Sequence, residues 1–139
     1  MEIIKEANKI KEELISIRRD FHMNPELDFD LPRTTGKIEE ILKKENIEYY
    51  RTSKNGICAI IRGNGEKTIA IRADMDALPM EDRKHCEYSS KIKGRMHACG
   101  HDVHTTILIG ACKVLNTMRD KLNGNVKFIF EPAEETTGG

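Results

Sequence analysis

Apolar residues recur every three or four positions in the first part of the chain, which is the spacing of an amphipathic helix. We expect a helix over residues 2–22 that ends at Asn24-Pro25, because proline does not continue a helix. A second helix is expected from Pro32 to about residue 45. The apolar stripes of the two helices are Ile3, Ala7, Ile10, Leu14, Ile17 and Phe21 in the first, and Ile38, Ile41 and Leu42 in the second.

Short runs rich in β-branched residues predict strands in the middle of the chain. We expect strands at residues 49–51, 57–62 and 67–73. The tight turn Gly63-Asn64-Gly65 lies between the last two, so they are expected to form an antiparallel hairpin. Residues 81–95 are polar without a clear period and are expected to form a loop.

The last part of the chain predicts one long helix and one apolar strand. The helix covers residues 103–121, with Ile107, Ala111, Val114 or Leu115, and Met118 facing inward, and the strand covers 126–130. Strands that alternate with helices indicate an α/β layer architecture. The chain ends a few residues after this strand, so we expect it to be the N-terminal part of a longer protein.

Length and charge exclude several classes of function. The 139 residues suffice for one domain with a real core, and 23 basic residues balance 23 acidic ones. A chain without net charge lacks the field that holds nucleic acid or an anionic membrane surface. Aromatic residues make up 5% of the chain, which disfavours base stacking on single strands. No apolar run approaches the roughly 18–20 residues of a membrane-spanning helix. From charge, aromatic content and hydropathy together, we expect neither nucleic acid nor a membrane as partner.

The cysteines and the N-terminus indicate a cytoplasmic protein. Lys and Glu are spread through the first fourteen residues, which is unlike a secretory signal. The four cysteines lack C-x-x-C spacing, and in a reducing compartment they are expected to be free, buried or metal-bound. They are Cys58, Cys86, Cys99 and Cys112.

Asp74-Met75-Asp76 directly follows the strand expected at 67–73. Residues two apart on an extended chain point the same way, so both carboxylates could face one cleft. Ligand sites of open α/β folds lie outside the carboxyl ends of strands. Taken alone, an acidic pair of this kind is more often a solvated loop.

Three of the five histidines fall within residues 97–104, around Cys99 and Gly100. An extended loop would present the Cys99 thiolate and the His101 imidazole on one side, and both suit zinc and related ions. Asp102 is expected to cap the following helix or to orient a ligating imidazole. His97 and His104 are expected to pack or support rather than to ligate. A helix cap with a buried cysteine and surface histidines remains the alternative.

Glu134-Glu135 follows the last expected strand. Adjacent side chains on an extended backbone diverge, so one carboxylate could bind a metal while the other takes a proton from water. A solvated acidic turn is the commoner explanation for such a pair alone. Together, the three clusters supply the donors of a two-metal hydrolase site.

Five segments carry a family resemblance, and they cover most of the chain from about residue 10. They are residues 18–22 (RRDFH), 24–26 (NPE), 71–79 (IRADMDALP), 96–104 (MHACGHDVH) and 128–139. They resemble the amidohydrolase branch of the dinuclear zinc metallopeptidases, which includes aminoacylase-like enzymes, hippurate hydrolases, indoleacetyl-amino-acid hydrolases and N-acetyldiaminopimelate deacetylases. The resemblance implies a three-layer α/β/α catalytic domain. Residues 1–139 would form its N-terminal part, without the lid or dimerisation domain.

The resemblance also implies the chemistry and the residues that perform it. Cys99, His101 and Glu135 match metal ligands, and Glu134 matches the general base. Asp74 matches a catalytic position, and Asp76 would support the site. The implied cofactors are two divalent ions, with zinc, manganese, cobalt and nickel as candidates. The implied reaction is hydrolysis of the amide bond of N-acyl-L-amino acids.

Two further histidine ligands of the family lie beyond the part that this chain matches, so the chain alone is expected to be inactive. An incomplete sheet would leave a free edge, and we therefore expect self-association or a homodimer. Two other classes of function stay open. One is a non-catalytic binding or structural module with a single zinc at Cys99 and His101. The other is a thiol redox protein that uses Cys99.

Overall fold

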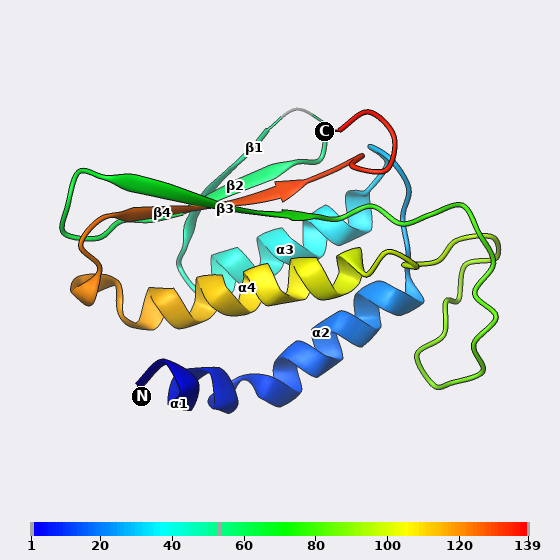
Figure 1. Cartoon of the computed structure of the whole chain (residues 1–139), viewed down its shortest axis with the longest axis horizontal. Helices are drawn as coiled ribbons and strands as arrows, with labels where there is room; N and C mark the ends of the chain where they lie inside the picture. The colour runs from blue at the N-terminus through cyan, green and yellow to red at the C-terminus, as the bar shows by residue number, and fades with distance from the viewer. Residues whose placement is uncertain (1, 53, 139) are drawn as a thin grey trace.

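The structure is a computed structural model that describes residues 2–52 and 54–138. Helices fill the first third of the chain, strands its middle, and a long helix precedes the last strand (Figure 1). In chain order the elements are α1 (Glu2–Lys9), α2 (Lys11–Met23), α3 (Pro32–Lys44), β1 (Glu48–Arg51), β2 (Ile57–Ile61), β3 (Thr68–Asp74), α4 (His101–Thr117), the 3₁₀ turn η1 (Arg119–Lys121) and β4 (Asn125–Glu131). All the expected strands are present, and residues 81–95 form a loop.

The helix expected over residues 2–22 is divided in two at Ile10, whose backbone leaves the helical region at φ −103° and ψ 5°. The second part, α2, buries Ile17 and Phe21 and ends directly before Asn24-Pro25, as expected. The start of α3 combines Pro32 with a carboxylate cap. The two carboxylate oxygens of Glu26 accept the backbone N–H groups of Arg33 and Thr34 in the first turn of α3.

The four strands form one sheet in the order β1-β2-β4-β3. The hairpin expected between residues 57–62 and 67–73 is wrong, because β4 lies between β2 and β3, antiparallel to the first and parallel to the second. The Gly63–Gly65 turn instead crosses the start of β4. A Cβ atom at Gly63 would lie 2.3 Å from the carbonyl oxygen of Gly124, so glycine permits this close crossing.

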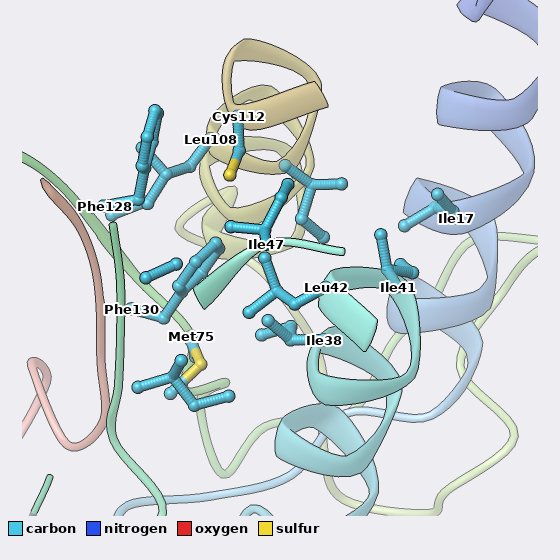
Figure 2. Packing of buried hydrophobic residues seen from close by; sticks show 14 of the residues in the cluster. Ile17, Ile38, Ile41, Leu42, Ile47, Met75, Leu108, Cys112, Phe128 and Phe130 are labelled. Carbon is cyan, nitrogen blue, oxygen red and sulfur yellow. The ribbon is translucent and has the colours of Figure 1, made fainter. Parts of the chain in front are cut away.

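The helices lie on one side of the sheet, and the core fills the space between them (Figure 1). Figure 2 shows side chains of α3 and α4 gathered beside Phe128 and Phe130 of β4, with Ile17 of α2 next to Ile41 of α3. The α/β class is therefore confirmed. The part of the chain that the structure describes supplies helices to one face of the sheet only.

The inward face expected for α4 is only partly right. Ile107 is 64% exposed, whereas Leu108, Ile109 and Cys112 are buried. Apolar residues surround α4, so its 3.6-residue period does not single out one face. The helix packs on both the sheet and α2, and this double contact decides which side chains are buried. In residues 2–52 and 54–138, no helix has the length and apolar character needed to cross a membrane.

Candidate metal centre

Two acidic loops meet at the carboxyl ends of β3 and β4. These strands are parallel and pair Asp74 with Glu131 at their ends. The Met75 backbone N–H then donates to the Glu131 carbonyl at 2.9 Å and keeps the departing chains together. Because parallel strands end at the same edge of a sheet, the loop that carries Asp76 lies beside the loop that carries Glu134.

Asp76 joins these two loops directly. Its buried carboxylate accepts the backbone N–H of Glu134 at 3.0 Å and that of Glu135 at 3.1 Å. Burial by itself would raise the pKa of Asp76, but hydrogen bonds from His101 and from both backbone N–H groups outweigh it and lower the pKa. The turn begins at Ala133, whose φ of +56° lies in the left-handed region that a side chain disfavours. Asp76 thus holds a strained turn with an ionised carboxylate.

His101 is oriented with one ring nitrogen toward the acidic cluster. Its Nδ1 lies 2.8 Å from the carbonyl oxygen of Asp76, and a carbonyl only accepts, so Nδ1 carries the hydrogen. Nε2 is then free to bind a cation, and it lies 3.5–3.6 Å from carboxylate oxygens of Asp74, Glu134 and Glu135. Burial lowers the pKa of His101, but the carboxylates of Asp76 and Asp74 raise it overall.

Cys99, His101 and Glu135 form a donor set that suits a divalent cation. One atom of each residue lies within 4.8 Å of the others. Within the described part of the chain, the buried Oε1 of Glu135 has no hydrogen-bond partner. The same carboxylate raises the pKa of the Cys99 thiol, because it disfavours a thiolate beside it. A divalent ion would satisfy both groups, so these residues fit a metal.

Asp74, His101 and His104 form a second group of potential ligands. His104 is half-exposed, and its Nδ1 lies 2.7 Å from Oδ1 of Asp74. His101 belongs to both groups but has only Nε2 available, so it can serve only one of them at a time. Whether His104 supports the site or ligates a metal stays a prediction, since its Nδ1 contacts Asp74 within a group of potential ligands.

The expectation that Asp102 caps α4 is wrong. Gly100 occupies the N-cap with φ +87°, and Asp102 is the second residue of the helix. Its fully buried carboxylate faces α2, where it contacts His22 Nδ1 at 2.7 Å and Arg18 Nε at 2.9 Å. Sequence reasoning assigned Arg18 and His22 no role, although both belong to the RRDFH segment and their spacing of four places them on one helix face.

His97 lies two residues before Cys99, and its side chain is buried, as expected for a packing residue. Burial lowers its pKa to about 4, so the imidazole is neutral at physiological pH. Neither ring nitrogen has a hydrogen-bond partner among residues 2–52 and 54–138. The charges of Asp102 and Asp76 oppose this lowering of the His97 pKa, whereas those of His22 and His101 add to it.

Comparison with known proteins gives consistent results. Residues 70–139 match the family model of peptidase family M20/M25/M40. The chain is 47% identical over 129 residues to N-acetylcysteine deacetylase of Bacillus subtilis, covering 91% of this chain and 34% of that protein. It is 39% identical over 140 residues to N-acyl-L-amino acid amidohydrolase of Geobacillus stearothermophilus, covering 99% of this chain and 38% of that protein.

A solved structure from Bacillus subtilis, described as a dinuclear metal binding peptidase of the M20 family, superposes with a TM-score of 0.88. It is 46% identical in sequence, and the match covers 92% of this chain and 36% of that chain. The chain therefore spans about a third of the length of the curated relatives it matches. These matches confirm the resemblance inferred from the five sequence segments.

Proposed function

This chain belongs to peptidase family M20/M25/M40, and we propose that it supplies part of the active site of an enzyme that hydrolyses the amide bond of N-acyl-L-amino acids. The observation that carries the proposal is the convergence of Cys99, His101 and Glu135, with Glu134 beside them. Relatives named N-acetylcysteine deacetylase and N-acyl-L-amino acid amidohydrolase support this substrate class.

Divalent metal is the proposed cofactor, and Cys99, His101 and Glu135 are its proposed ligands. The donor set suits zinc, and manganese, cobalt and nickel are the other candidates. The dinuclear site of the similar Bacillus subtilis structure supports two ions in the whole protein. When bound, such ions polarise the acyl carbonyl and make water more acidic.

Glu134 is the proposed general base. Its carboxylate is 38% exposed and lies 3.6 Å from His101 Nε2, while Asp76 fixes its backbone. From this position Glu134 takes the proton of the attacking water as the acyl carbon–oxygen bond forms. It then gives that proton to the amine as the carbon–nitrogen bond breaks, so that the products are a carboxylic acid and a free amino acid.

Asp74 and Asp76 have different supporting roles in this proposal. Asp76 holds the Nδ1 side of His101 and the turn of Glu134, so it positions both the ligand and the base. Asp74 orients His104 and adds negative charge beside His101 Nε2. Negative charge here favours binding of cations over anions.

The two alternative functions are less well supported by the site. A closed structural zinc site needs four nitrogen or sulfur ligands and no spare base, whereas here two glutamates lie beside Cys99 and His101. A redox thiol needs a lowered pKa, whereas Glu135 raises that of Cys99.

We also propose a cytoplasmic protein that acts on a small molecule and self-associates. The four cysteines are free, which agrees with a reducing compartment. At the open edge of the sheet, β3 exposes Ile69 at 61% and Ile71 at 37%. An unpaired edge strand with exposed isoleucines favours pairing with another chain.

Hydrolysis of N-acetyl and N-benzoyl amino acids by the metal-loaded full-length protein tests the function. We expect Glu134→Gln to lower kcat by about 10²–10⁴-fold while metal content stays unchanged. Glu131→Gln is the matched control, because Glu131 lies on β4 paired with Arg72 rather than among the candidate ligands, and it should leave kcat within about threefold of the parent. Full activity of Glu134→Gln would exclude Glu134 as the base, and a parent protein without stoichiometric metal would exclude the metal site.

A further inference from the structure

The contacts of Asp102 connect the start of α4 to a distant helix. Its carboxylate is fully buried, and Oδ2 accepts the Nδ1–H of His22 at 2.7 Å. The guanidinium of Arg18 forms an ion pair with the same oxygen, with its Nε 2.9 Å away. Both groups project from α2, four residues apart on one helix face, and lie about eighty residues earlier in the chain. One carboxylate oxygen is therefore held by two groups of a single neighbouring helix.

The first turn of α4 has few local restraints of its own. Among the residues that the structure describes, no side chain caps it, and its N-cap is the left-handed Gly100. Its position is instead fixed by four contacts to other elements: His101 to Asp76, His104 to the Asp74 carboxylate, Thr105 to the Asp74 carbonyl, and Asp102 to α2. The first three contacts join the start of the helix to β3 and the loop that follows it. Asp102 alone among the four restrains the side of the turn that faces α2.

Stability alone is a weak reason for a buried carboxylate at this position. A well-packed apolar residue often stabilises a protein as much as a buried ion pair does. The same two helices also have a second polar link, since Lys113 of α4 contacts Glu13 of α2 at 2.7 Å and Glu45 at 2.8 Å. The network of Arg18, His22 and Asp102 has a different location from that link. Asp102 directly follows His101 in the sequence and lies three residues after Cys99.

We propose that Arg18, His22 and Asp102 form a positioning network that sets the Cys99–His101 segment in the geometry required to bind metal. The proposal rests on the proposed metal site, and it assigns a role to Arg18 and His22 of α2, which contact Asp102 beside the candidate ligands. Groups that orient metal ligands from behind commonly change metal affinity by 10–100-fold when they are replaced.

Metal affinity and the cobalt spectrum of the full-length protein test the proposal. We expect Asp102→Asn to weaken zinc binding by about 10–100-fold, measured by competition with a chelator, and to alter the cobalt–thiolate absorption band. Arg18→Met changes a partly exposed residue and should shift both readouts in the same direction, even if Asp102→Asn fails to fold. His22→Asn keeps an amide N–H near the position of Nδ1 and should retain more affinity than His22→Leu.

Lys113→Met is the matched control because it breaks the other buried ionic link between α2 and α4. It should lower the unfolding temperature while zinc affinity and the cobalt band stay those of the parent. If Asp102→Asn and Arg18→Met behave like this control, the network is only structural and the proposal is wrong. If the parent itself binds no metal, the proposed function fails first, so the two failures are distinguishable.

Discussion

Replacing Asp76 with asparagine tests whether one carboxylate holds the candidate site together. Its two oxygens each accept one backbone N–H, from Glu134 at 3.0 Å and from Glu135 at 3.1 Å. Asparagine has nearly the same shape, but one of its terminal atoms is an amide nitrogen that donates and does not accept. One N–H of the turn therefore loses its partner where the side chain is 1% exposed and water does not replace it.

The size of the effect follows from these contacts. A hydrogen bond to a charged acceptor contributes about 1.5–3 kcal/mol, and an unpaired buried donor costs about 1–3 kcal/mol. Both figures describe the same lost contact and are not added, so we expect Asp76→Asn to reduce the free energy of unfolding by about 1.5–3 kcal/mol. That is a large share of the 5–15 kcal/mol typical of a domain.

Urea unfolding of Asp76→Asn beside Glu26→Gln is the appropriate assay. Glu26 also accepts two backbone N–H groups, from Arg33 at 3.0 Å and from Thr34 at 2.7 Å, but it is only half-buried. Because water can replace a lost contact there, Glu26→Gln should cost about 0.5–1 kcal/mol, as for a helix cap. Equal losses of stability in the two variants would show that Asp76 does not hold the turn of Glu134 and Glu135.

Three further substitutions have expected outcomes. Gly100→Ala should reduce stability by about 1–2 kcal/mol in thermal unfolding, because the φ of +87° at this position strains any residue with a side chain. A Cβ atom here would meet nothing within 4 Å, so the cost comes from the backbone alone, and an unchanged Tm would contradict this. Phe130→Ala should cost about 3–5 kcal/mol in urea, since the ring is fully buried, and a loss below about 1 kcal/mol would mean that the core collapses around it. The Ser89 hydroxyl lowers the pKa of Cys86, so alkylation of Cys86 should reach half its maximal rate below pH 9 and decline as pH falls through that pKa. Ser89→Ala should move this midpoint upward, and Cys86→Ser should remove the reaction phase.

The candidate site was more predictable than the sheet that carries it. Asp74, Cys99, His101 and Glu135 lie at strand ends or beside a helix start, which an α/β fold brings to one edge, whereas only the family resemblance assigns them their roles. The structure brings them together as that rule requires. Each of these residues sits next to a boundary that glycine, proline or a β-branched run marks locally in the sequence.

The strand order was not predictable in the same way. A glycine turn between two strands usually closes a hairpin, and the sequence around Gly63 contains nothing that shows β4 between them. That arrangement depends on contacts between residues more than fifty positions apart, such as Ile57 with Phe130. The contact of His22 with Asp102 is equally distant in sequence, and no period or spacing identifies it.

The central position of β4 in the sheet, more than the edge strand β3, accounts for the precise placement of the site residues. β4 is hydrogen-bonded along both edges, so two neighbours independently fix the register that sets Glu131 opposite Asp74. A slip of one residue would turn Phe128 and Phe130 out of the core, and their burial therefore opposes it. Glu134 lies only three residues after Glu131, the last residue of β4, so the same hydrophobic packing that stabilises the sheet also places the proposed base. In contrast, β3 has one free edge, and the carboxylate of Asp76 is needed to lock its loop against that of β4.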